Sequence, residues 1–324
     1  MILIIRPSQL VRSRRPTAVA IGNFDGLHLG HRRILKTLVE SARRGRLRPV
    51  VLTFSPHPEK VLGGSAIRMI QSLPRRAQEI RRLGVPDVRI MAFNRSFAHL
   101  PAARFVEDIL VRRLKARVVV VGAGFRFGNK REGSVASLQA EGARFGFVVK
   151  AILPLRRGGA LVSSSRIRSL LETGRIGEAN RLLGRPYEIE GRVVRGRARG
   201  RTLGFPTANI RTPNELLPGG IFIARVILGG RALPALAYIG SRPTFLEKGT
   251  SIEVHCLDFR GNLYGCRVRV QFLKKLRNDR PFPDAGALVR QMEKDAAAAR
   301  ARFRRSARSS ADVSPWSFGR ESKG

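Results

Sequence analysis

Two of the chain's five histidines stand three residues apart in the run AIGNFDGLHLGH, residues 20–31. The apolar residues 17–24 are typical of a buried strand, and residues 31–40 have the apolar spacing of an amphipathic helix. His28 and His31 would then share one face where the helix begins. Backbone N–H groups and the helix dipole favour a phosphate there, and imidazoles can donate hydrogen bonds to a phosphoryl oxygen. The pattern predicts a phosphoryl-transfer site, and a tight turn with two solvated histidines is the simpler alternative.

Neighbouring residues extend this prediction. Gly30 would let a phosphate approach the backbone closely, and Asn23 would add a donor at the end of the strand. Further along, in the run LVSSSRIRSLLETG, Ser163 can cap a helix. Ser165 and Arg168 would lie on one face of that helix and present a hydroxyl and a guanidinium to a phosphate chain. Taken alone, the serines are equally typical of a common helix start.

A second candidate site lies in the run GRVVRGRARGRTLGFPTANI, residues 191–210. Its glycines are interspersed with arginines, which suits a mobile cationic loop over phosphates. These glycines are Gly196, Gly200 and Gly204. Thr207 and Asn209 stand two apart in the strand that follows and therefore point to the same side. Two neutral oxygen ligands suit Mg²⁺, whereas an ordinary basic strand is the alternative.

The elements that must position these residues fall into two patterns. Up to about residue 184, buried strand-like runs alternate with helical runs, which predicts an α/β unit with a doubly wound parallel sheet. Ligands of such sheets bind beyond the carboxyl ends of the strands. The strand-like runs are residues 17–24, 49–54, 87–93, 117–125 and 147–155, and the helical runs between them include 74–84 and 101–115.

After residues 184–188 strand-like runs follow one another with no helix until 284–303. Gly229–Gly230 and the run RGNLYG, 260–265, are typical of hairpin turns. This pattern predicts a small antiparallel β-barrel with a C-terminal helix. The strand-like runs are residues 187–194, 221–228, 231–240, 251–259 and 266–276. We therefore expect domains at 1–184 and 185–305, followed by a disordered tail at 306–324.

Composition agrees with two domains and raises one rival function. The chain has 324 residues, 43% of them hydrophobic, and a formal net charge of +39. That charge suggests nucleic-acid binding, but the arginines are spread along the whole chain, and a positive surface also suits a polyanionic small molecule. Nucleic-acid binding is therefore kept as a minority hypothesis.

Composition also bears on location. No run of about 18 apolar residues is present, so no membrane span is expected. The first residues lack the order of a signal peptide. Cys256 and Cys266 could face each other across a hairpin, but two cysteines make no disulfide framework and show no metal spacing. We expect a soluble cytoplasmic protein.

The motifs together resemble known families. GNFDGLHLGH resembles the HxGH signature of nucleotidyltransferases, and LVSSSRIRSLLETG resembles the ISSTxIR element of bacterial FMN adenylyltransferases. TFSPHP and VGAGFRFGNKREG are similar to two intervening loops of that family. GRTLGFPTAN, YIGSRPTF, SIEVHCLDFRGNLYG and LRNDRPF resemble the successive motifs of riboflavin kinases. In this order the motifs cover residues 17–303 and resemble the bifunctional bacterial riboflavin kinase/FAD synthetases.

The resemblance implies two ATP-dependent reactions, riboflavin to FMN and FMN to FAD, with Mg²⁺ as the cofactor. It implies that Glu253 is the catalytic base of the kinase, that His28 and His31 act in adenylyl transfer, and that Thr207 and Asn209 hold the metal. It places ATP and phosphate at Gly22, Asn23, Gly30, Ser164, Ser165, Arg168, Gly196, Gly200 and Gly204, and the flavin at Phe54, His57, Phe125 and Arg277. The implied partners are small molecules, with no specific nucleic acid and no membrane, in a monomer or weak oligomer.

Three positions carry open questions. Gly124 stands where the family often has Asp or Asn, and Tyr238 stands where Asn is usual. An enzyme with only one active module is therefore the alternative. His57 lies between prolines and is equally a binding residue or a turn residue.

Overall fold

A computed structural model describes residues 4–63, 67–196, 204–241 and 250–309, which form two compact units. The first unit comprises Met1–Ser169, Arg181–Arg185 and Asn214–Leu216, and the second comprises Leu170–Asn180, Pro186–Pro213 and Leu217–Gly324. The main change of unit thus comes near residue 185, although the short stretch Leu170–Asn180 belongs to the second unit.

The first unit is built on a six-stranded sheet in which all neighbouring strands pair in parallel. Its strands are β1 (Ile4–Ile5), β2 (Thr17–Ile21), β3 (Arg48–Ser55), β4 (Asp87–Ala92), β5 (Ala116–Gly122) and β6 (Val148–Ile152). The predicted doubly wound sheet is confirmed. Only β1 was not predicted, because two residues are too short to show a period.

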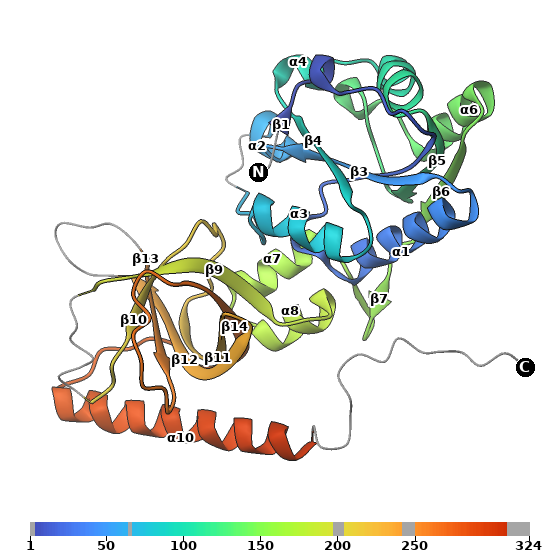
Figure 1. The fold of residues 1–324 in the computed structure, drawn as a ribbon. Helices are drawn as coiled ribbons and strands as arrows, with labels where there is room; N and C mark the ends of the chain where they lie inside the picture. The colour runs from blue at the N-terminus through green and yellow to red at the C-terminus, as the bar shows by residue number, and fades with distance from the viewer. Residues whose placement is uncertain (1–3, 64–66, 197–203, 242–249, 310–324) are drawn as a thin grey trace, which may run out of the picture. The chain divides into compact units, whose positions relative to one another are not determined.

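Helices cover both faces of this sheet (Figure 1). On one face Leu35 and Leu38 of α1 (Leu29–Arg44) and Ile80 of α3 (Leu73–Arg82) pack on β2 and β3. On the other face the π-helix η3 (Phe105–Arg113) and α6 (Val135–Phe145) pack on the alternate strand residues. Consecutive strand residues point to opposite faces, so a fully buried strand such as β2 contributes to both cores.

Shorter elements complete the unit and lead into the second. They are η1 (Pro7–Gln9), η2 (Asp25–Leu27), α2 (Pro58–Leu62), α4 (Arg95–Ala98), α5 (Ala102–Arg104), η4 (Asn129–Arg131), β7 (Arg156–Arg157), β8 (Ala160–Leu161), α7 (Ser164–Glu172) and α8 (Ile176–Leu183).

The strand order β1-β4-β3-β2-β5-β6 places the reversal of the sheet between β2 and β5. Chain connections run away from each other at such a point and leave a crevice beyond the carboxyl ends of the strands. The run with His28 and His31 follows β2 directly, so it begins in this crevice.

The second unit is a closed six-stranded antiparallel barrel in the order β10-β13-β12-β11-β14-β9. Its strands are β9 (Tyr187–Val194), β10 (Ala208–Arg211), β11 (Gly220–Leu228), β12 (Arg231–Ser241), β13 (Thr250–Cys256) and β14 (Arg267–Arg277). The rings of Tyr187, Phe222 and Phe272 pack together, with centroid distances of 5.8 and 5.2 Å to Phe272. The predicted barrel is confirmed.

The helix α10 (Ala285–Ser309) lies along the outside of this barrel (Figure 1). Ala296 and Ala299 of α10 pack against Ile223 and Leu236, which point outward from β11 and β12. The helix continues past the predicted end at 303, so the expected disorder of 306–324 is wrong for 306–309, where Ala and Arg favour helix. Residues 310–324 lie outside the described part of the chain.

Two turn predictions have different outcomes. Gly229 and Gly230, with φ of 54° and 87°, form the hairpin turn between β11 and β12 as predicted. The run RGNLYG forms no hairpin, because β12 and β11 lie between β13 and β14 in the barrel. Cys256 and Cys266 consequently do not face each other, and both thiols are free.

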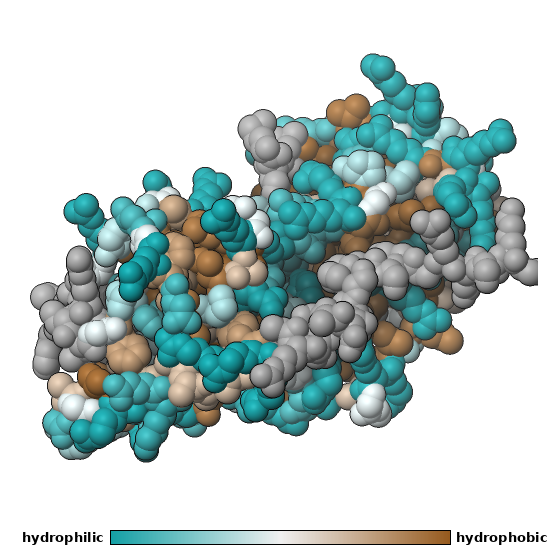
Figure 2. Space-filling view, turned by 60° about the horizontal axis from the view of Figure 1, so that its bottom comes forward, coloured by the Kyte–Doolittle hydropathy of each residue, from teal (hydrophilic) through white to brown (hydrophobic). Residues whose placement is uncertain are grey.

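Hydrophilic side chains cover most of the molecular face drawn in Figure 2. Within the described residues, no helix combines the length and the apolar character needed to cross a membrane.

Candidate functional site

The two histidines meet at the start of α1. His28 is the N-cap of the helix, and its Nδ1 accepts a hydrogen bond of 3.3 Å from the backbone N–H of His31. The two rings stack with centroids 3.6 Å apart. A Cβ on Gly30 would lie 3.2 Å from the His28 ring, so glycine leaves room for that ring. The pair predicted from the sequence is thus a packed unit beyond β2 and not two solvated side chains.

Burial keeps both rings neutral. His28 is 6% exposed, and burial lowers its pKa to about 4. Burial also lowers the pKa of His31 far below its usual value, and the nearby charge of Arg76 acts in the same direction. Because Nδ1 of His28 accepts a hydrogen bond, the neutral ring carries its proton on Nε2. The two imidazoles therefore act as neutral hydrogen-bonding groups at neutral pH.

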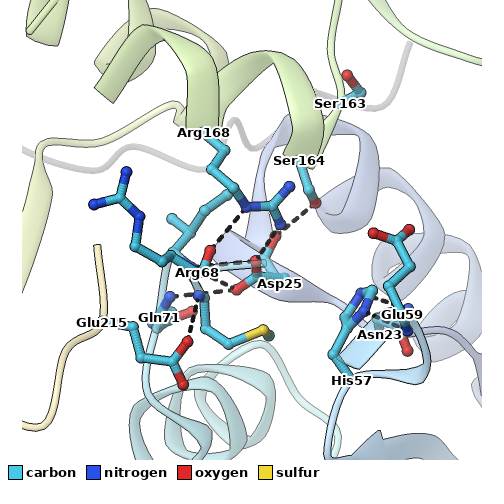
Figure 3. Close-up of polar contacts among 12 residues, drawn as sticks. Asn23, Asp25, His57, Glu59, Arg68, Gln71, Ser163, Ser164, Arg168 and Glu215 are labelled. Atoms are coloured by element: carbon cyan, nitrogen blue, oxygen red, sulfur yellow. Dashed lines mark hydrogen bonds and ion pairs between the residues drawn. The ribbon is translucent and has the colours of Figure 1, made fainter. Parts of the chain in front are cut away.

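Asn23 lies against His57 from the next strand (Figure 3). The Asn23 amide is 2.9 Å from Nε2 of His57, whose Nδ1 accepts from the backbone N–H of Glu59 and so caps α2. The Asn23 atom in this contact is the amide Nδ2. His57 thus caps α2 and contacts Asn23 beyond the end of β2.

A buried carboxylate that the sequence analysis missed organises the rest of this site. Asp25 is 1% exposed and accepts from the backbone N–H groups of Ile70 and Gln71. Arg168 donates to the same carboxylate at 3.0 Å and to the carbonyl of Arg68 at 2.8 Å (Figure 3). The guanidinium expected on phosphate is therefore bound to Asp25. An acid set between an apolar strand and a glycine turn is the signal that could have found it.

The serines at the start of α7 have separate roles. Ser163 caps the helix by accepting from the backbone N–H of Arg166, as predicted. Ser164 donates to the backbone carbonyl of Asp25 at 2.9 Å, and Ser165 is exposed. Gly22 lies on the other side of the turn, where a Cβ would be 3.3 Å from the Phe24 ring.

Aromatic rings line the neighbouring strand ends. Phe54 is half-buried, with its ring centroid 6.0 Å from those of both Phe93 and Phe97, and Phe125 stacks on Phe127 at 5.5 Å. Of these rings, only Phe54 and Phe125 were predicted from the sequence. A Cβ on Gly124 would meet no atom within 4 Å, so the side chain usual in the family would project into open space.

The second site is a cavity of about 680 Å³ outside the barrel, lined by barrel residues, by 279–285 and by α10. Glu253 lines it and accepts from the hydroxyls of Thr207 at 3.1 Å and Ser251 at 3.2 Å. Asn209 of β10 lies directly opposite Glu253 of β13 in the strand register. A Cβ on Gly196 would lie 2.0 Å from the Asn209 side chain, so a larger residue there would displace the Asn209 amide.

The cationic loop is described only at its ends. Gly204 has a φ of 77°, a backbone conformation that favours glycine. Gly200 lies outside the described residues.

Within the described chain, no group of three or more His, Cys, Asp or Glu side chains could hold a metal. The hydroxyl, amide and carboxylate oxygens of Thr207, Asn209 and Glu253 are nevertheless the donors that Mg²⁺ takes beside water and phosphate.

Tyr238 fastens one wall of the cavity. Its hydroxyl donates to Asp279 at 2.7 Å, and burial together with this bond raises the pKa of the phenol. The side chain extends over Gly240, where a Cβ would be 2.1 Å from the hydroxyl oxygen. Tyr238 also lies opposite Glu253 in the strand register. The position with an unusual residue is therefore part of the site.

Two further residues are held by backbone or helix contacts. Arg277 donates through two nitrogens to Asp295 of α10, at 3.0 and 2.9 Å, and lies 5.5 Å from the centre of the Phe282 ring. His255 donates from Nδ1 to the carbonyl of Pro206 at 2.9 Å. His255 thus holds the residue before Thr207, a role the sequence did not indicate.

Both halves of the chain match known protein families. A family model for FAD synthetase matches residues 10–166, and one for riboflavin kinase matches 183–303. Bifunctional riboflavin kinase/FMN adenylyltransferases are 38% identical over 288 residues in Escherichia coli K12 and 33% over 301 in Bacillus subtilis 168. The alignments cover 88% and 90% of this chain and 92% and 94% of those proteins.

A solved structure is similar to most of the chain. It is described as a macrolide-efflux protein from Streptococcus pneumoniae and has a TM-score of 0.85 at 29% identity. The match covers 92% of this chain and 98% of the other.

We expect acid to destabilise the first unit through His28. A ring with a pKa of about 4 when folded and about 6.5 when unfolded takes up a proton on unfolding. The free energy of unfolding therefore falls as the pH drops from 6.5 to 4, by at most about 3 kcal/mol. His28→Asn keeps an N-cap that does not titrate, so its acid sensitivity should be smaller. Amide hydrogen exchange in β2 and α1 at several pH values measures this, and equal pH dependence in both proteins would contradict it.

Proposed function

The chain belongs to the family of bifunctional riboflavin kinase/FMN adenylyltransferases, and we propose that its two units divide the two reactions at the sites described above. The enzyme phosphorylates riboflavin to FMN and adenylylates FMN to FAD, each time with ATP. In this proposal residues 1–184 carry the adenylyltransferase and residues 185–305 the kinase. The division follows the order of the two family models along the chain.

The observation that carries the kinase assignment is the contact of Glu253 with Thr207 in one cavity, with Asn209 opposite Glu253 in the strand register. Glu253 accepts the proton of the ribityl hydroxyl as that oxygen bonds to the γ-phosphorus of ATP and ADP leaves. Thr207 and Asn209 would hold Mg²⁺, which supplies charge neutralisation on the transferring phosphoryl group. Arg277 and Tyr238 hold the walls against which the flavin binds.

In the adenylyltransferase a phosphate oxygen of FMN bonds to the α-phosphorus of ATP, and the bond to the leaving pyrophosphate breaks. Asn23, His28 and His31 lie where donors can stabilise the charge that develops on these oxygens. Their fixed packing means that little reorganisation is needed during the reaction. Phe54 and Phe125 offer ring surfaces for the isoalloxazine.

The partners, location and oligomeric state of the enzyme belong to the same proposal. We propose small molecules as the partners of the enzyme, which acts in the cytoplasm as a monomer or weak oligomer. The strongly positive chain attracts ATP and FMN, both of which are anionic.

Replacing Glu253 by Gln should slow riboflavin phosphorylation and leave FAD formation intact. The amide cannot accept the proton, so kcat for riboflavin phosphorylation should fall by about 10²- to 10⁴-fold while supplied FMN is still converted to FAD. A chromatographic assay with riboflavin or FMN, ATP and Mg²⁺ measures both. His28→Ala should show the reverse pattern. Loss of both reactions in either variant would contradict the division into two sites.

Replacing Asn209 by Ala should weaken metal use by the kinase. With one oxygen ligand removed, the Mg²⁺ concentration for half-maximal phosphorylation should rise tenfold or more. Removing a residue that merely supports a metal ligand already lowers metal affinity by about 10- to 100-fold. A Mg²⁺ titration of FMN formation measures the change, with FAD formation by the same variant as the internal control. An unchanged titration curve would remove Asn209 from the metal site.

Replacing Tyr238 by Phe removes the hydrogen bond to Asp279 without emptying the space of the ring. One such bond contributes about 0.5–1.5 kcal/mol, so KM for riboflavin should rise by roughly two- to tenfold. Tyr264→Phe, at a half-exposed tyrosine outside the cavity, is the matched control. A KM within error of the wild-type value would show that the contact does not hold the flavin wall.

A further inference from the structure

Three buried side chains near Asp25 have polar atoms without a hydrogen-bond partner among the described residues. They are Nδ1 of His31, both amide atoms of Gln71 and Nε of Arg76. Gln71 is 5% exposed and Arg76 is 3% exposed. Buried polar atoms nearly always have partners, so such a group at the end of β2 marks a place where a ligand supplies them.

Arg76 is the charged member of this group. It lies in the first half of α3, whose N-cap Ser72 follows the residues that bind Asp25. The side chain is buried, and its positive charge contributes to lowering the pKa of both His31 and His57. Ile80, four residues further along α3 and on the same face, packs in one cluster with Phe24 and Leu27 of the turn after β2, so the helix places Arg76 beside that turn.

No acid in the described chain forms an ion pair with Arg76. The nearby carboxylate of Asp25 is occupied by Arg168 and by the N–H groups of Ile70 and Gln71. The adjacent Arg75 is also buried and its Nε likewise has no partner, but its Nη2 pairs with Glu79 at 2.6 Å. Burial lowers the pKa of Arg76, and the charge of Asp25 offsets this only in part. A buried guanidinium without an ion pair is costly, and an anionic ligand beside it removes this cost.

We propose that Arg76 is a substrate-binding residue of the adenylyl-transfer site, where its guanidinium binds the phosphate chain of ATP beside His31. This rests on the assignment of adenylyl transfer to the first unit. Arg168 instead holds Asp25 and shapes the turn before His28. As the bond from the α-phosphorus to the bridging oxygen breaks, that oxygen leaves with the electron pair on pyrophosphate, and Arg76 neutralises its charge.

Kinetics of the full-length enzyme test this proposal. Arg76→Met keeps much of the volume and removes the charge, so KM for ATP in FAD formation and the inhibition constant of pyrophosphate should each rise tenfold or more. Arg76→Lys restores a point charge without the planar fork and should fall between wild type and Arg76→Met. Riboflavin phosphorylation by the same proteins should be unchanged.

The matched control is Arg75→Met, which removes a buried arginine already paired with Glu79. It should lower the thermal midpoint and leave KM for ATP and pyrophosphate inhibition near wild type. A purely structural Arg76 would give this same pattern in Arg76→Met, and that result would overturn the proposal.

Two other results would also overturn it. A rise in KM for FMN alone would place Arg76 on the flavin phosphate and not on ATP. If Arg76→Met does not fold, Arg76→Lys is the deciding variant. If Arg76→Lys has the wild-type KM for ATP and the wild-type inhibition by pyrophosphate, the contact of Arg76 with the phosphate chain is excluded.

Discussion

The site of the first unit depends on the buried carboxylate of Asp25. This one side chain joins the turn after β2, the segment before α3 and, through Arg168, the start of α7. Removing either partner of a buried ion pair leaves an uncompensated charge and commonly costs about 3–5 kcal/mol. The turn that leads to the two stacked histidines is therefore held by an interaction that performs no chemistry itself.

The second unit places its chemistry differently. The barrel interior is filled by the rings of Tyr187, Phe222 and Phe272, so it holds no substrate. The cavity lies outside, where α10 and the residues before it cover the face that carries Glu253. Alternation along β13 explains this arrangement, because Ile252 and Val254 enter the core and Glu253 is directed outward.

The net charge of +39 suggested nucleic-acid binding, but neither of the two family models that match the chain describes a nucleic-acid-binding protein. The family models match enzymes of flavin nucleotide synthesis over both units. Within the sites, the arginines that matter are few and have distinct partners: Arg168 holds an acid, Arg277 is held by α10, and Arg76 has no acid of its own. Charge counts alone therefore say little about which arginine meets a substrate.

The sequence by itself determined the two architectures and most of the motifs. The parallel sheet, the barrel and the hairpin turn at Gly229–Gly230 were predicted correctly, because each depends on a local pattern of apolar and turn residues. Only the tertiary structure decided that RGNLYG joins two separated strands, that Arg168 is bound to Asp25, and that Arg76 is buried without an acid. The physical reason is that a charged side chain's partner is set by packing between distant segments, which local spacing does not encode.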